Sequence, residues 1–117
     1  MGQYLQRVAD NILPLSVAGT LPEAFKEWYF TGRTEDHEQA IEDCQLCNQE
    51  QLRYHFEIEN QHTHHHLWVG SQCILKFKVA VYEDDRLLDQ KAAKKKLSSL
   101  VNQMRLQSCI SALEKLV

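Results

Sequence analysis

The sequence predicts an α+β fold with a helical N-terminal part, a central module that contains a β-hairpin, and a long C-terminal helical segment. Three observations predict it. Apolar residues recur at helical spacing before residue 34, they alternate with polar residues from 52 to 59, and glycine and proline are absent from 87 to 117. The chain has 117 residues, the length of a single domain, which we divide into segments 1–34, 35–82 and 83–117.

The first segment is expected to contain two helices. Residues 3–13 place apolar side chains on one helical face, and Pro14 ends this helix. The side chains of this face are Leu5, Val8, Ala9 and Ile12.

The second helix is expected to begin after Thr20. Thr20 and Glu23 have the spacing of a capping box, and Gly32 is suited to the end of a helix. Between them an apolar stripe recurs at helical spacing, which we interpret as core. It consists of Phe25, Trp28 and Tyr29.

The β-hairpin is expected in the middle segment. Residues 52–59 alternate between apolar and polar side chains, residues 66–70 form a returning strand, and the polar stretch 60–65 forms the loop between them. The apolar face of the first strand consists of Leu52, Tyr54, Phe56 and Ile58. After the hairpin we expect a helical turn at Cys73, with a strand following it as an open alternative.

The last segment starts with a turn or a helix start at residues 83–86 and then shows a helical pattern to its end. Its apolar residues fall into two groups that do not share a face, so we expect a bend or break near Gln107. The groups are Leu97, Val101 and Met104, and then Leu106, Ile110, Leu113 and Val117.

Three cysteines of the middle segment have the layout of a metal site. Cys44 and Cys47 are separated by two residues, a spacing that lets both thiolates reach one ion from a tight turn. Antiparallel pairing of the hairpin returns Gly70 beside Leu52, which carries Cys73 back to the same end. A knuckle, a hairpin and a cysteine at the next turn form a treble-clef-like zinc site. The alternatives are a redox-active cysteine pair or, in a secreted protein, disulfide bridges.

The histidine cluster of the hairpin loop is excluded from this site by distance. A strand rises about 3.3 Å per residue, so the loop lies roughly 25 Å from the cysteines. A zinc–nitrogen bond measures about 2.1 Å. The loop is therefore a solvated turn, or a second, weak metal site or proton-sensitive patch of its own. Its histidines are His62, His64, His65 and His66.

A fourth zinc ligand has to come from another part of the chain. Our first choice is His37, seven residues before Cys44 in a polar stretch that can fold back. The second choice is His55, roughly 10 Å along the first strand. Cys109 of the last segment is a third choice, and its alternative role is that of a small buried apolar residue. The remaining choices are Asp36, Asp43 or water.

The central motif resembles a group of small bacterial and mobile-element proteins. These proteins share a CxLC knuckle, a strand similar to LRYHFEI, an asparagine, and LWVGSxCI followed by a basic–aromatic pair. The matching positions here are Cys44 to Cys47, residues 52–58, Asn60, residues 67–74, and Lys76 with Phe77. The resemblance implies a treble-clef-like zinc site and no defined activity. Such modules often carry glycine after the second cysteine, where Asn48 stands here and also tolerates a left-handed backbone.

Composition favours a cytoplasmic protein that does not enter a membrane. No run of about 18 apolar residues is present, and the N-terminus lacks the features of a signal peptide. The net charge is −3, with eight acidic and one basic residue in 35–59, and seven basic and two acidic residues in 86–117. This uneven distribution argues against a uniformly basic nucleic-acid-binding surface.

A non-catalytic adaptor or regulatory protein is the function that these patterns favour, with another protein as the partner. The alternative is a zinc-stabilised nucleic-acid-binding module that uses the basic residues of the last segment. A zinc enzyme is disfavoured, because neither HExxH nor the deaminase pair H-x-E and P-C-x-x-C occurs in order, and three-thiolate sites are usually closed. The candidate nucleic-acid contacts are Lys91, Lys94, Lys95, Lys96 and Arg105.

Overall fold

The computed structural model describes residues 2–40, 42–49 and 52–115. The helices are α1 (Gly2–Ile12), α2 (Leu21–Phe25), α3 (Ser71–Lys76) and α4 (Gln90–Lys115), with a 3-10 helix, η1 (Leu13–Leu15), after α1. The strands are β1 (Trp28–Asp36), β2 (Tyr54–Asn60), β3 (His66–Val69), β4 (Tyr82–Glu83) and β5 (Arg86–Leu87). The predicted mixture of helices, a hairpin and a long C-terminal helix is therefore confirmed.

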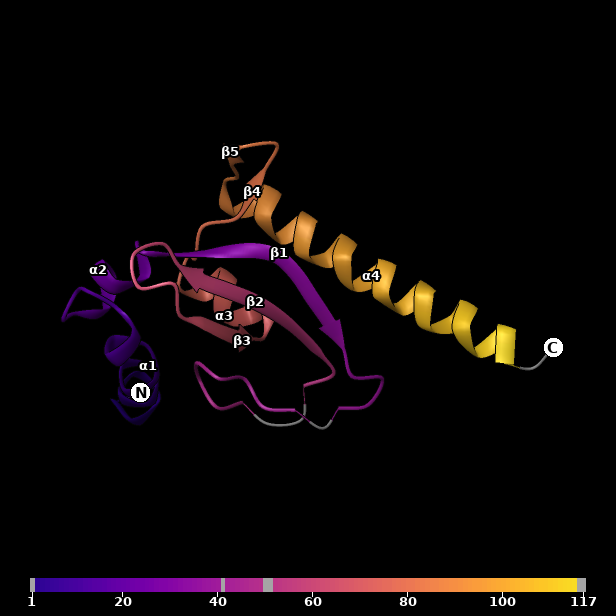
Figure 1. The fold of residues 1–117 in the computed structure, drawn as a ribbon, viewed down its shortest axis with the longest axis horizontal. Coiled ribbons are helices and arrows are strands. Elements are labelled where there is room, and N and C mark those ends of the chain that lie inside the picture. The colour runs from indigo at the N-terminus through magenta and orange to yellow at the C-terminus, as the bar shows by residue number, and fades with distance from the viewer. Residues whose placement is uncertain (1, 41, 50–51, 116–117) are drawn as a thin grey trace.

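An antiparallel sheet in the order β1-β2-β3 forms the centre of the molecule (Figure 1). The β2–β3 hairpin is the predicted one, with Phe56 opposite Val69 and Glu59 opposite His66. One face of the sheet packs its apolar side chains against α1, α3 and the start of α4. Gly70 comes so close to Leu52 that a Cβ on Gly70 would lie 3.2 Å from the Leu52 side chain, which confirms the expected return of the chain.

Strand β1 replaces the second half of a predicted helix. Residues 28 and 29 were expected to continue the helix that carries Phe25, but α2 ends at Phe25 and the chain becomes extended. Trp28 and Phe30 are buried on alternate positions, and aromatic and threonine residues favour a strand when a neighbour is available for pairing. The prediction failed because β2, distant in sequence, supplies that neighbour.

Two end signals of that helix also have other roles. Thr20 precedes α2 but makes no side-chain capping bond, so the predicted capping box is wrong. Gly32 lies inside β1, with a φ of +94°, where the register with β2 shifts between Phe30 and Thr34. This left-handed backbone suits glycine, and the glycine marks a bulge and not a helix end.

Helix α4 runs without interruption from Gln90 to Lys115, so the break predicted near Gln107 is wrong. Ala93 and Leu97 near its start are buried, whereas Leu106 and Leu113 remain 62% and 64% exposed. The change of apolar face therefore marks the point where the helix leaves the core. Figure 1 shows α4 extending away from the sheet. Val117, the last member of the second apolar group, lies outside the described residues.

The segment between α3 and α4 is a turn with little strand. Ser71 begins α3, which confirms the helical turn expected at Cys73. The strand proposed as the alternative after it is reduced to a single bridge between Tyr29 and Ala80 and to the short β4–β5 hairpin, which turns at Asp84 and Asp85.

Candidate metal centre

Three cysteines lie together at the end of the hairpin opposite its loop. Among the described residues, Cys44, Cys47 and Cys73 form a group whose ligand atoms all lie within 4.8 Å of one another. All three side chains are buried, with exposures of 1%, 5% and 3%. The knuckle supplies two of them and the first turn of α3 supplies the third. The hairpin geometry inferred from the sequence therefore brings the predicted cysteines together.

The spacing of the sulfurs fits a metal ion better than a disulfide. The Sγ atoms of Cys44 and Cys73 are 3.7 Å apart. Two sulfurs bound to one tetrahedral zinc at about 2.3 Å each are separated by about 3.8 Å, whereas a disulfide bond is about 2.05 Å long. The three residues can therefore hold a metal ion. Three thiolate ligands suit a metal that binds sulfur, such as zinc.

Cys44 has the electrostatic environment of a thiolate. The hydrogen bond with Cys73 is the largest cause of a lowered pKa at Cys44; together with the backbone N–H groups of Cys47, Gly70 and Leu46, and against the opposing effect of burial, it brings this pKa to about 5. The same contact and burial raise the pKa of Cys73. A metal ion binds thiolates, so these backbone donors favour metal binding by stabilising the charged sulfur.

A tight turn positions the knuckle. The N–H of Asn48 donates to the carbonyl oxygen of Cys44 at 2.8 Å, and the N–H of Cys44 donates to that of Gln49 at 2.9 Å. Asn48 has a φ of 63°, the left-handed conformation expected for this position. The side chain of Asn11 at the end of α1 donates to the Leu46 carbonyl at 2.8 Å. Thus α1 supports the knuckle, a contact that sequence patterns did not reveal.

His37 and His55 pair with each other. The Nε2 atom of His37 lies 3.0 Å from Nδ1 of His55, and Nε2 of His55 lies 2.7 Å from the carbonyl oxygen of Asp43. A carbonyl only accepts, so His55 donates from Nε2 and its Nδ1 accepts from His37 when both rings are neutral. Neither ring belongs to the cysteine group. His55 is buried and holds the residue that precedes Cys44, so its position is that of a support for the knuckle.

The other candidate ligands also lie outside the cysteine group. Cys109 is exposed on α4, which contradicts the alternative explanation that it is a buried apolar residue. The carboxylate of Asp36 accepts two hydrogen bonds from the Arg53 guanidinium, at 2.8 and 3.1 Å. That interaction holds the pKa of Asp36 below its usual value. The identity of the fourth ligand stays a prediction.

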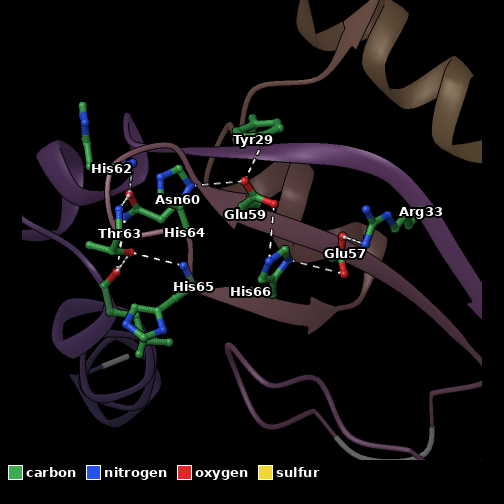
Figure 2. A network of polar contacts seen from close by, with 11 residues as sticks. Tyr29, Arg33, Glu57, Glu59, Asn60, His62, Thr63, His64, His65 and His66 are labelled. Carbon is green, nitrogen blue, oxygen red and sulfur yellow. Dashed lines mark hydrogen bonds and ion pairs between the residues drawn. The ribbon is translucent and has the colours of Figure 1, made fainter.

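The histidine loop is tied to carboxylates and to the N-terminal segment (Figure 2). His66 lies between Glu57 and Glu59, with nitrogen–oxygen distances of 3.5 and 3.4 Å. The opposite side of the loop is anchored where Thr63 donates to the Leu15 carbonyl at 2.6 Å. Sequence reasoning placed the loop at the far tip of the hairpin but missed both anchors. Leu15 is remote in sequence, and the contact of His66 with Glu57 and Glu59 depends on the exact register of β2 and β3.

The part of the chain that the structure describes holds no second group of three metal-ligating atoms. The Nδ1 atom of His66 lies near Glu57 and its Nε2 atom lies near Glu59, so the ring links the two carboxylates. The three side chains therefore do not direct their ligand atoms toward a common metal position.

Of the basic residues of α4 that were predicted to contact nucleic acid, one is hydrogen bonded within the protein and the others are exposed. Lys96 donates to the Tyr82 carbonyl oxygen at 2.9 Å, so it holds the β4–β5 hairpin against the helix. The other predicted nucleic-acid contacts are exposed: Lys91, Lys94, Lys95 and Arg105.

The chain matches no protein-family model, no curated protein and no solved structure. In the described residues, no helix combines the length and the apolar character needed to cross a membrane.

Proposed function

We propose that this protein is a small non-catalytic zinc protein that works in the cytoplasm as an adaptor or regulator through contacts with another protein. The observation that supports the zinc centre most directly is the buried group of three cysteine sulfurs, two of them 3.7 Å apart. Zinc is the expected metal because a buried set of thiolates is typical of structural zinc sites. The knuckle, the hairpin and the cysteine of α3 together form a treble-clef-like arrangement, as the resemblance implies.

The distal half of α4 is the proposed surface for a protein partner. Leu106, Ile110 and Leu113 are 62%, 39% and 64% exposed and recur at intervals of four and three residues. Apolar residues at this spacing form one helical face, and such a face is buried in most complexes that bind through a helix. The globular part, held by the metal, would then present this helix in a fixed direction.

Binding experiments with a matched pair of variants test this role. Full-length protein is used to capture partners from its own cells, in parallel with Leu106→Asp/Leu113→Asp, which removes the apolar face, and Lys91→Asp, which changes charge elsewhere on α4. A partner retained by the wild-type protein and by Lys91→Asp but lost with the leucine variant supports the proposal. Equal retention by all three proteins would contradict it.

A second candidate function is nucleic-acid binding through α4, favoured by the exposure of Lys91, Lys94, Lys95 and Arg105. Because binding to phosphates releases counterions, affinity for DNA or RNA would fall steeply as salt increases. Binding measured across a salt series, with Lys91→Ala/Lys94→Ala/Lys95→Ala as the comparison, tests it. No binding at low salt would exclude this alternative.

A further inference from the structure

An open groove lies along β1, beside the β4–β5 hairpin. It has a volume of about 800 Å³. Its lining includes every residue of the segment 26–32, together with Ala80 and residues 82–85. The strand part of this segment, residues 28–32, extends over about 16 Å. The groove therefore has the length of an extended peptide segment and not of a single amino acid.

Strand β1 is an edge strand of the sheet. The strand order places β2 on one side of it, and on the other side the described residues supply one bridge, between Tyr29 and Ala80. In this bridge the N–H of Phe30 donates to the Ala80 carbonyl oxygen at 2.8 Å. The groove continues past it to Thr31 and Gly32. Because an edge strand can pair with an extended peptide, the groove offers such a peptide both a backbone to pair with and space for its side chains.

The turn between β4 and β5 places two carboxylates at the groove. Asp84 and Asp85 line it, and both residues are exposed. They have a left-handed backbone, with φ values of 51° and 64°, as in two-residue hairpin turns that favour asparagine and glycine. Asparagine tolerates this conformation, so replacing both aspartates by asparagine removes two charges and keeps the turn.

The two lysines of the lining are each held by a glutamate. The Nζ atom of Lys96 lies 3.9 Å from Glu83, and that of Lys26 lies 3.2 Å from Glu23. These positive charges are therefore offset locally. The other exposed charged groups of the described lining are the two aspartates of the turn, which favour a cationic side chain at this end of the groove.

Two tyrosines add aromatic surface to the lining. Tyr82 is exposed beside the turn, and Tyr29 is fixed by a hydrogen bond from its hydroxyl to the Glu59 carboxylate at 2.9 Å. The face of a tyrosine ring attracts an ammonium or guanidinium group. Aromatic rings next to carboxylates are therefore suited to the side chains of lysine and arginine.

We propose that this groove binds an extended segment of a partner protein that carries arginine or lysine side chains. The segment runs along β1 beyond Ala80, and one cationic side chain lies between Tyr82 and the aspartates of the turn. A small amine would occupy only the carboxylate end, whereas the groove follows the strand. This surface is separate from the distal half of α4, so the inference goes beyond the proposed function and gives the protein a second binding surface.

Fluorescence anisotropy with a labelled peptide tests the inference on the full-length protein. The probe is a hexapeptide of alternating arginine and serine, because alternate side chains of an extended chain point the same way. Asp84→Asn/Asp85→Asn should weaken its binding by about tenfold, since two exposed charges are lost. Tyr82→Ala should weaken it by about threefold, and Tyr82→Phe, which keeps the ring face, should bind like the wild type.

Glu114→Gln is the matched control, because it removes a negative charge from α4 outside the groove, and it should leave binding unchanged. Equal weakening by this control and by the aspartate variant would overturn the inference. So would equal binding of a peptide with glutamine in place of arginine, or displacement of the probe by spermidine as effective as by the unlabelled peptide. Leu106→Asp/Leu113→Asp should bind the probe like the wild type, so this experiment and the test of α4 can fail independently.

Discussion

The two ends of the β2–β3 hairpin both gather potential metal ligands, yet they have opposite structures. At one end, the cysteines are buried and their ligand atoms lie within 4.8 Å of one another. At the other, His64 and His66 have side chains that are 74% and 41% exposed and face glutamates. Two histidines of the conspicuous cluster therefore lie beside glutamate carboxylates at the edge of the protein, while the sparse cysteines form the buried group. Convergence on one point, and not the number of ligand residues, distinguishes a metal site.

Cys73→Ser should have the largest effect on stability. The metal-bound state depends on this ligand, because metal binding is coupled to folding, so we expect a loss of more than about 4 kcal/mol in the free energy of unfolding. Urea unfolding in the presence of zinc, followed by tryptophan fluorescence, measures it. Cys109→Ser changes an exposed cysteine and serves as the control. Equal urea midpoints for the two variants would contradict the claim that a metal bound at the cysteines stabilises the fold.

His55→Ala should have an intermediate effect and separates support from ligation. The ring is buried and bonds to Asp43 and His37, so its removal leaves a cavity and an unpaired carbonyl oxygen at a cost of about 2–3 kcal/mol. The zinc content should stay at one per chain. A variant that folds but no longer holds zinc would show instead that His55 is a ligand.

Glu27→Gln tests the anchor of the histidine end through its pH dependence. The Glu27 carboxylate accepts backbone N–H groups from Val17 and Ala18, at 2.8 Å each, and the Asn60 amide at 2.9 Å. These bonds, with that of Val17 the strongest cause, hold the pKa of Glu27 below 4.5. A lowered pKa means that the stabilisation is complete above pH 4.5 and is lost as the pH falls through the folded-state pKa.

The wild-type protein should therefore have the higher melting temperature at neutral pH, and its advantage over Glu27→Gln should shrink below pH 4.5. Melting curves of both proteins from pH 7 to pH 3 measure this difference. A difference that stays constant across that range would show that the carboxylate charge is not involved.

Replacing His64, His65 and His66 together by alanine should have the smallest effect. The contacts of these exposed histidine rings with glutamates contribute up to about 1 kcal/mol even when the rings are protonated, and the buried Glu57 keeps its hydrogen bond from Thr31 at 2.9 Å. We expect the stability to change by about 1 kcal/mol or less and the zinc content to remain the same. Loss of the metal in this triple variant would show that the histidine end of the hairpin contributes to metal binding, contrary to our account.

The sequence predicted the features that depend on local periodicity and chain path. The alternation of residues 52–59 predicted β2, and antiparallel return then placed Cys73 beside Cys44. Trp28 and Tyr29 misled because their spacing from Phe25 suits a helix as well as a core strand, and only the distant β2 decides between them. The apolar pattern of α4 wrongly predicted a break near Gln107, because a helix that leaves the core can change its apolar face and remain continuous.

The surroundings of the site were less accessible from sequence. His37 was predicted to fold back as the fourth ligand; its Nε2 atom lies 3.0 Å from Nδ1 of His55, and its role as a ligand stays a prediction. Asn11 and Arg7 come from a helix remote in sequence, and their approach to the knuckle follows from tertiary packing that no local pattern encodes. The cysteines supplied by a local motif can therefore be predicted from the sequence, whereas the residues that surround them through tertiary packing cannot.

The metal content of the protein tests the central claim most directly. The full-length chain is purified without a nickel resin, dialysed against metal-free buffer, and analysed by elemental mass spectrometry, together with Cys73→Ser prepared in the same way. The account predicts close to one equivalent of zinc in the wild-type protein and nearly none in the variant. Less than about half an equivalent in the wild-type protein, or the same content in both, would contradict a structural zinc centre at Cys44, Cys47 and Cys73.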